Sequence, residues 1–258
     1  MSCFAPYSIG MPTRFRRILL LLPVSLSVCA GEMVLSSGDG QRVLMELYTS
    51  EGCSSCPPME RYINGFTTQD ALWEVFIPVA FHVDYWDYIG WEDRFASPEF
   101  AARQRQHARE GSVRSVYTPT LIVNGKGWRP GLSAELPKPN TRSTGTLNVR
   151  VDQKSVTADF ESVSGDVQSL DLHIALLGMG LESSITAGEN QGRTLRHDFV
   201  VIGFKSLQGA NAHWHTRLPE LRSRDTEPRA LAVWVTDSGR LKPLQAVGGY
   251  LDGYNLPP

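Results

Sequence analysis

The stretch VLMELYTSEGCSSCPP (residues 43–58) places two cysteines directly after a run that is typical of a buried strand. Two residues separate Cys53 from Cys56, and two prolines follow at positions where a helix can begin. At the N-terminus of a helix, unpaired backbone N–H groups and the helix dipole stabilise a thiolate. The stretch therefore predicts that Cys53 is a nucleophile and that Cys56 resolves the mixed disulfide that Cys53 forms.

The composition is that of an ordinary globular chain. Of its 258 residues, 41% are hydrophobic and 20% are charged, which excludes a disordered polar polymer and a multi-span membrane protein. The formal net charge is -2, from 25 basic and 27 acidic residues. Nucleic acid is not expected as a partner, because phosphate binding requires clustered positive charge. The length suits two domains of modest size.

Residues 1–30 have the pattern of a secretory signal peptide. Three arginines precede an apolar run over residues 18–28, and Ala30 supplies a small residue for cleavage. The run is shorter than the about 20 residues that a membrane-spanning helix needs, so a transmembrane anchor is the weaker interpretation. Lipidation of Cys29 is disfavoured by the bulky Val28 before it. The sequence predicts a periplasmic or secreted protein that contacts the membrane through the signal peptide alone.

Removal of this peptide changes both the charge and the cysteine content. Residues 1–30 carry three arginines and no acidic residue, so 22 basic residues (25 minus 3) and 27 acidic residues remain, a net charge of -5. Cys3 and Cys29 are lost, and Cys53 and Cys56 remain. A single close cysteine pair in an exported protein is either a local disulfide or a redox centre.

Strand-like and helix-like segments alternate in the first half of the chain. The strand at 43–48 precedes a short helix at 58–66, and residues 76–84 form a near-continuous apolar run suited to a buried strand. A second helix is expected from Ser97 and Pro98 to about residue 110, followed by a strand at 117–124. This alternation predicts an α/β sheet.

The second half of the chain has a different pattern. Residues 125–145 are rich in Gly, Pro, Ser, Asn and Thr and are expected to form a linker. Beyond them, apolar and polar residues alternate with a period of two at 147–151, 156–160 and 170–176. Short strands with turn residues between them predict an antiparallel β-sandwich.

Five motifs together carry a family resemblance. TSEGCSSCPP, FHVDYWDYIGW, FASPEFAARQ, SVYTPTLIVNG and GENQGRTLRH resemble a family of secreted bacterial thioredoxin-like proteins that is catalogued as a domain of unknown function. The resemblance implies an α/β plus all-β fold, with a thioredoxin-like domain at 31–135 and a β-sandwich domain at 136–258. It also implies that Thr118 and Pro119 form a cis-proline turn opposite the cysteines and bind an extended substrate.

The cysteine motif departs from that of ordinary thioredoxins. Ser54 and Ser55 replace Gly-Pro, and Leu47 stands where thioredoxins carry a buried acid. Glu51 is expected to oppose thiolate formation at Cys53 through its own charge. These departures leave the direction of electron flow open.

A second group of polar residues ends the apolar strand. At a period of two, His82 and Asp84 share one face. Two interpretations fit them: a proton shuttle for the thiols, or a buried His–Asp pair that fixes the strand end. The aromatic residues at 85–91 form either a wall for a peptide or a second core under a loop. Residues 188–197, with Arg193 and His197, are expected to form a structured turn.

Three functions remain open at this point. The first is a thiol–disulfide oxidoreductase that uses Cys53 and Cys56, acts on protein or peptide thiols and disulfides, and needs no cofactor. The second is a non-catalytic envelope binding or assembly module with a structural disulfide. The third is Cu(I) handling through Cys53, Cys56 and His82. No metal-binding residues are assigned beyond that alternative, because the acidic residues near Asp84 match no cation-binding loop.

Overall fold

The computed structural model describes residues 32–130, 136–138, 140–165, 169–209, 211–222 and 226–251. The predicted signal peptide at 1–30 lies outside the described residues. Among the residues described, no helix combines the length and the apolar character that crossing a membrane requires.

The described residues form sixteen strands, two α-helices and two short 3-10 helices. In chain order these elements are β1 (Met33–Ser36), β2 (Gly40–Gln41), β3 (Val43–Thr49), α1 (Pro57–Asn64), η1 (Gly65–Thr68), β4 (Phe76–His82), η2 (Asp87–Ile89), α2 (Pro98–Arg109), β5 (Thr120–Val123), β6 (Lys126–Trp128), β7 (Asn140–Ser143), β8 (Gly145–Asp152), β9 (Ser155–Ser162), β10 (Leu170–Gly178), β11 (Leu181–Ser184), β12 (Thr194–His197), β13 (Val200–Gly209), β14 (His213–Arg217), β15 (Ala230–Asp237) and β16 (Pro243–Tyr250).

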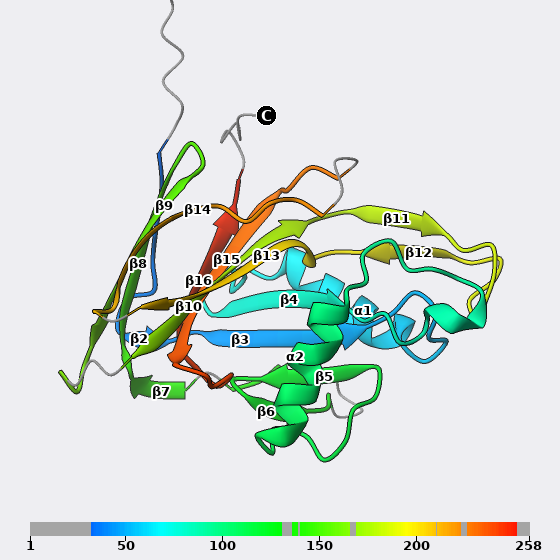
Figure 1. Cartoon of the computed structure of the whole chain (residues 1–258), viewed down its shortest axis with the longest axis horizontal. Helices are drawn as coiled ribbons and strands as arrows, with labels where there is room; N and C mark the ends of the chain where they lie inside the picture. The colour runs from blue at the N-terminus through cyan, green and yellow to red at the C-terminus, as the bar shows by residue number, and fades with distance from the viewer. Residues whose placement is uncertain are drawn as a thin grey trace, which may run out of the picture.

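Eight of the strands form one sheet, in the order β16-β15-β10-β13-β4-β3-β5-β6 (Figure 1). β4 pairs in parallel with β3 on one side and with β13 on the other, the latter at Ala80 and Val200. The other neighbours in the sheet are antiparallel. The sheet therefore joins strands from both halves of the chain.

The fold class predicted from the sequence, an α/β thioredoxin-like domain followed by an antiparallel β-sandwich, is wrong. The described residues are mainly β, and the main sheet continues across the expected boundary between residues 135 and 136. The physical reason lies at the edge of β4, where the Ala80 N–H donates to the Phe199 carbonyl at 2.8 Å. An unpaired strand edge exposes a row of backbone groups, and β13 covers this one. The expected linker at 125–145 contains β6 and β7.

A second sheet, in the order β1-β8-β9-β14, packs on the C-terminal strands of the main sheet. The alternating pattern predicted at 147–151 and 156–160 occurs in β8 and β9, whose apolar residues are buried. They share one hydrophobic core with Leu172 and Ile174 of β10. Ala175 of β10 belongs instead to the core around β3 and β4. Both faces of β10 are covered, which accounts for its nearly continuous apolar sequence.

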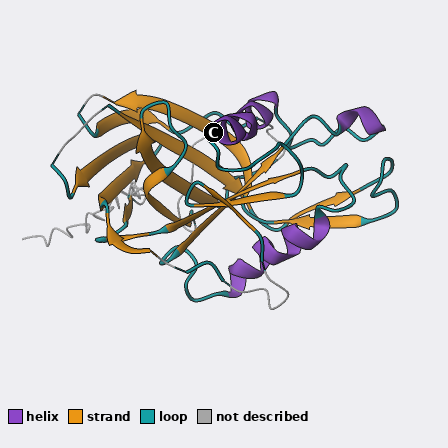
Figure 2. Cartoon of the chain, turned by 90° about the horizontal axis from the view of Figure 1, so that it is seen from below, coloured by secondary structure: helices purple, strands orange, loops and turns teal. Residues whose placement is uncertain are grey.

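Helices lie on both sides of the main sheet (Figure 2). Because successive strand residues point to opposite faces, β4 shows which helix covers which side. Phe81 contacts Phe100 of α2 with ring centroids 4.9 Å apart, whereas Phe76 contacts Phe66 of η1, directly after α1, at 5.1 Å. His82 shares the face of Phe76 and therefore points toward the α1 side.

A buried ion pair fixes α2 to the sheet. The Glu46 carboxylate of β3 accepts from Arg103 Nε at 2.9 Å and lies 3.3 Å from His107 Nε2. Burial alone would raise the pKa of Glu46, but the charge of Arg103 and the contacts of His107 lower it well below its ordinary value of 4.5. The guanidinium of Arg103 also lies over the rings of Phe81 and Trp234, so α2 spans strands from both halves of the chain.

Glu46→Gln is expected to lower the free energy of unfolding by about 3–5 kcal/mol, because it leaves the buried Arg103 charge unpaired. Glu74→Gln is the matched control, since Glu74 is 78% exposed in its pair with Arg42 and should change stability by about 0–1 kcal/mol. A lowered pKa adds stability above pH 4.5 that is lost as the pH falls, so the effect of Glu46→Gln should shrink in acid. Urea unfolding at several pH values measures the free energy of unfolding of both variants. If Glu46→Gln and Glu74→Gln lost equal stability, the buried ion pair of Glu46 would not be what fixes α2.

Candidate functional site

The two cysteines lie in the turn between β3 and α1. Cys56 is the N-cap residue of α1, and Pro57 and Pro58 occupy the first helical positions. Both thiols are free and buried, with 1% of Cys53 and 0% of Cys56 exposed. Cys53 Sγ lies 3.2 Å from Ser55 Oγ and 3.8 Å from the carbonyl oxygen of Thr118. The structure thus brings Cys53, Cys56 and Thr118 together.

The two thiols differ in acidity. Hydrogen bonding by Cys56 outweighs the effect of burial and, with smaller contributions from Ser55 and Thr118, lowers the pKa of Cys53 to about 6. Burial raises the pKa of Cys56 far above its ordinary value of 9.0, and the neighbouring Cys53 raises it further. Near neutral pH, Cys53 is therefore mainly a thiolate and Cys56 a thiol. Since the thiolate is the reactive form, Cys53 is the better nucleophile.

Thr118 and Pro119 form the wall opposite the cysteines. Their peptide bond is cis, as the family resemblance implied. Trp86 Nε1 donates to Thr118 Oγ1 at 2.7 Å, so one of the clustered aromatic residues holds this turn in place. Pro119 and Ser55 line an open pocket of about 380 Å³, whose other lining residues include Met59, Tyr117 and Trp128.

The loop between β11 and β12 packs against the cysteine turn. Asn190 is fully buried and donates through Nδ2 to the carbonyl oxygens of Glu51, at 2.8 Å, and Cys53, at 3.0 Å. Glu189 accepts from the N–H and the hydroxyl of Ser54 at 3.0 and 2.7 Å. Residues about 135 positions apart in the chain therefore determine the conformation of the cysteine turn.

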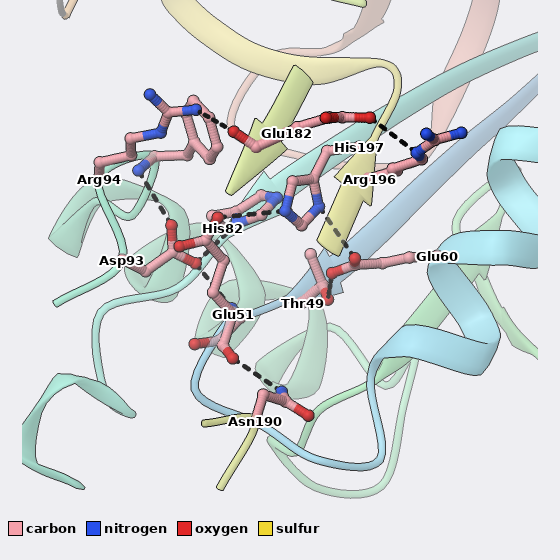
Figure 3. Close-up of polar contacts among 12 residues, drawn as sticks. Thr49, Glu51, Glu60, His82, Asp93, Arg94, Glu182, Asn190, Arg196 and His197 are labelled. Carbon is pink, nitrogen blue, oxygen red and sulfur yellow. Dashed lines mark hydrogen bonds and ion pairs between the residues drawn. The ribbon is translucent and has the colours of Figure 1, made fainter. Parts of the chain in front are cut away.

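Beneath the turn, acidic and histidine side chains form a buried cluster (Figure 3). Asp93 contacts His82 Nδ1 at 2.6 Å and accepts from the N–H groups of Glu51 and Phe95 at 2.9 and 3.0 Å. The Glu51 carboxylate accepts from Trp91 Nε1 at 2.8 Å. A second indole of the aromatic cluster thus contacts a residue next to the cysteines. The cluster links the cysteine turn to the end of β4.

His197, the last residue of β12, completes this cluster. Its Nε2 lies 3.1 Å from Glu51 Oε1, and its Nδ1 lies 2.9 Å from Glu60 Oε2 (Figure 3). Burial alone would lower the pKa of His197, but the carboxylates of Glu51 and Glu60 raise it to about 10. Thr49 donates to the other Glu60 oxygen. The cluster is therefore a set of compensated charges.

Three members of the cluster bring potential ligand atoms together. Glu60, His82 and His197 each offer one such atom, and these atoms lie within 4.8 Å of one another. In the part of the chain that the structure describes, no such group combines His82 with Cys53 or Cys56. The geometry therefore does not favour the Cu(I) site that the sequence left open.

The family model described as a protein of unknown function, DUF1223, matches residues 44–236. The chain belongs to the DUF1223 family. None of the curated proteins matches it. A crystal structure of a protein from Agrobacterium tumefaciens is similar with a TM-score of 0.58 and 18% identity, covering 82% of this chain and 94% of that one. HBP35 of Porphyromonas gingivalis has a TM-score of 0.53 and 15% identity, covering 83% and 76%. At such identities the likeness concerns the fold alone.

In this DUF1223 protein, the structure rearranges the residues that the sequence singled out. His82 contacts Asp93, eleven positions later, instead of Asp84, which is half-exposed. His197 was expected only as part of a structured turn, and its place in the cluster was missed. His197 was marked by its place at the end of the motif GENQGRTLRH, whereas Asp93 falls between two of the motifs and carried no such signal. Spacing alone relates neither residue to His82.

Cys56→Ala is expected to raise the pKa of Cys53 in this DUF1223 protein from about 6 toward its ordinary value of 9.0, because it removes the strongest hydrogen bond to the thiolate. Cys56→Ser is the matched control, since its hydroxyl still donates and should keep the pKa close to 6. The thiolate absorbance of each variant, followed as the pH is raised, measures the midpoint. Coincident midpoints would show that Cys56 does not stabilise the Cys53 thiolate.

Asn190→Ala should lower the free energy of unfolding of the same protein by about 1–3 kcal/mol, because the buried carbonyls of Glu51 and Cys53 lose their donor. Gln208→Ala is the control, since its bonds to Ser169 and Ser238 are exposed and their loss should cost less than about 0.5 kcal/mol. Urea unfolding measures both, and amide exchange at residues 51–56 should quicken in Asn190→Ala alone. Unchanged exchange there would argue against a role of Asn190 in holding the turn.

Proposed function

We propose that this protein exchanges thiols and disulfides with other proteins or peptides, with Cys53 as the nucleophile and Cys56 as the resolving cysteine. The observation that carries the proposal is the position of two free thiols at the start of α1, with Cys53 Sγ 3.8 Å from the Thr118 carbonyl oxygen. The unequal acidity of the pair supports it, since the pKa of Cys53 is lowered to about 6, whereas that of Cys56 is raised. A purely structural disulfide does not require this difference. Reactive cysteines characteristically have a lowered pKa.

The reaction proceeds through a mixed disulfide. The Cys53 thiolate attacks one sulfur of a substrate disulfide, a Cys53–substrate bond forms, and the other substrate sulfur leaves as a thiolate. Cys56 then gives its proton to that thiolate and attacks Cys53 Sγ, which releases the second substrate sulfur as a thiolate. The cysteines end as a disulfide, and the substrate has gained two electrons and one proton. The same reaction steps in the reverse order oxidise a substrate dithiol.

The acidity of Cys53 favours this reverse, oxidising direction. The hydrogen bonds that stabilise its thiolate act in the reduced protein, so they draw the pair toward reduction and its substrate toward oxidation. A thiolate with a low pKa also leaves readily when a second substrate thiol attacks the mixed disulfide. We expect a reduction potential between about -270 and -120 mV, the range of enzymes whose attacking cysteines have a pKa of about 7 and about 3.5.

The pocket beside Pro119 suits an extended substrate segment. It opens next to Ser55, within the cysteine motif, and continues to Trp128 on β6. β6 is the terminal strand of the main sheet, but its Gly127 N–H already donates to the Ser112 carbonyl at 2.8 Å, so the pocket and not this strand edge would hold the substrate segment. An apolar residue of the substrate would pack on Pro119 and Trp128 while the neighbouring sulfur reaches Cys53.

The signal-peptide pattern in residues 1–30 supports action outside the cytoplasm, in the periplasm or in the medium. Disulfides form and persist in those compartments. Exported proteins with reduced cysteines are the substrate class that fits both the location and the direction of exchange.

The decisive experiment combines a redox titration with trapping. The wild-type protein is equilibrated with a series of glutathione mixtures, and Cys56→Ser is incubated with a disulfide-containing peptide. We expect a potential in the range given above and a stable mixed disulfide on Cys53. Cys53→Ser is the matched control and should trap none. A potential below about -300 mV with no trapped peptide would instead identify a structural disulfide, consistent with a binding or assembly module.

A further inference from the structure

The buried cluster contains one imidazole nitrogen without a partner, close to a second that contacts a carboxylate. Within the described residues, His82 Nε2 has no hydrogen-bond partner although its side chain is only 1% exposed, and the nearby His197 Nδ1, on a side chain 2% exposed, contacts Glu60 Oε2 at 2.9 Å. Unpaired buried polar atoms are uncommon in proteins because desolvation without a partner costs free energy. Glu60, itself 5% exposed, offers one ligand atom, and so do His82 and His197; these three atoms lie within 4.8 Å of one another.

We infer that Glu60, His82 and His197 bind a divalent transition-metal ion between α1, β4 and β12. The inference does not depend on the proposed thiol exchange, because neither cysteine belongs to this group of ligands. Two imidazoles and one carboxylate are a ligand set that zinc uses, with a fourth position left for water or another ligand.

The opposite nitrogen of each imidazole is already oriented by a carboxylate. His82 Nδ1 contacts Asp93 at 2.6 Å, and His197 Nε2 contacts Glu51 at 3.1 Å. Histidines that bind metals almost always donate their other ring N–H to such a group, which fixes the tautomer and aims the free lone pair at the ion. Thr49 donates to the Glu60 carboxylate in the same way. Each of the three ligands therefore has a hydrogen-bonding partner that orients it.

The chemistry of the ligands selects the class of ion. The site offers nitrogen and oxygen donors and no sulfur, which favours Zn²⁺ and similar divalent ions over Cu(I). Three carboxylates, those of Glu51, Glu60 and Asp93, surround two imidazoles. A divalent cation would offset two of the three negative charges, and its coordination would displace protons from the two imidazoles.

The ligands come from parts of the chain that are far apart. Glu60 lies on α1, His82 ends β4 and His197 ends β12, so one ion would connect three elements beneath the cysteine turn. An ion that binds the folded state stabilises it by mass action, and the melting temperature should rise with metal concentration.

Zinc is the probe for the first test. The whole exported protein is prepared without metal and offered Zn²⁺ both after folding and during refolding, because the ligands are buried. We expect one Zn²⁺ per chain and a rise in melting temperature. X-ray absorption should show nitrogen or oxygen ligands at about 2.0–2.1 Å and none at the about 2.3 Å that is typical of zinc–sulfur bonds.

Variants then assign the ligands. His82→Asn and His197→Asn should weaken zinc binding by more than the about 10–100-fold expected for Asp93→Asn, which alters only the outer shell. His173→Asn is the matched control, since His173 is buried but hydrogen-bonded to Ser206 and Thr236, and it should bind zinc normally. The double variant Cys53→Ser, Cys56→Ser should also bind one Zn²⁺, which separates this site from the thiol chemistry.

Three results would overturn the inference: no stoichiometric zinc on the wild-type protein under either loading condition, sulfur in its coordination shell, or unchanged affinity in His197→Asn. The absorption spectrum is taken on the unaltered chain, so it decides the matter even if the histidine variants do not fold.

Discussion

The burial of the Glu51 carboxylate, two residues before the first cysteine, constrains the whole cysteine turn. A buried charge is costly unless it is paired, and the partner of Glu51 is His197, 146 positions along the chain. β12 lies against α1, and His197 at its end supplies this partner to Glu51. The loop before β12 then supplies Asn190, which binds the carbonyls of Glu51 and Cys53. The second half of the chain is in this sense a part of the cysteine site.

The same pairing resolves a conflict in the sequence. From its position in the sequence, two residues before Cys53, Glu51 is expected to oppose a thiolate there, because like charges repel. In the folded protein the Glu51 side chain contacts His197 and Trp91, so its charge is balanced there. The Cys53 thiolate is stabilised separately, by Cys56, Ser55 and Thr118. Glu51 and Cys53 are close in sequence but thus lie in two different electrostatic environments. The negative charge of Glu51 is balanced by His197, whereas hydrogen bonds stabilise the anion at Cys53.

Local features of the fold were predictable because their causes are local. The apolar run at 76–84 forms β4, and Ser97 caps α2 by accepting from the N–H of Glu99, with Pro98 at the first position. The pairing of β4 with β13 could not be predicted, because nothing in the sequence of either strand specifies a neighbour that lies 120 residues away in the chain. For the same reason the expected boundary at 135 and 136 does not divide the main sheet. At the site, the sequence marked Cys53, Cys56 and His82, but the partners Asp93 and His197 depend on how the chain returns to β4.

The first turn of α1 brings the two parts of the site together. Cys56 caps the helix and Glu60 follows one turn later on the same face, where its N–H donates to the Cys56 carbonyl at 3.1 Å. Between them, the Thr49 hydroxyl donates to Glu60, and Thr49 also has a small lowering effect on the pKa of Cys56. The geometry that holds the resolving thiol is therefore the geometry that holds the Glu60 carboxylate in the buried cluster. A shift of this single helical turn would disturb both, which explains why α1 is anchored at Glu60 by His197 from β12 and at Asn64, which donates to the Arg196 carbonyl at 2.8 Å.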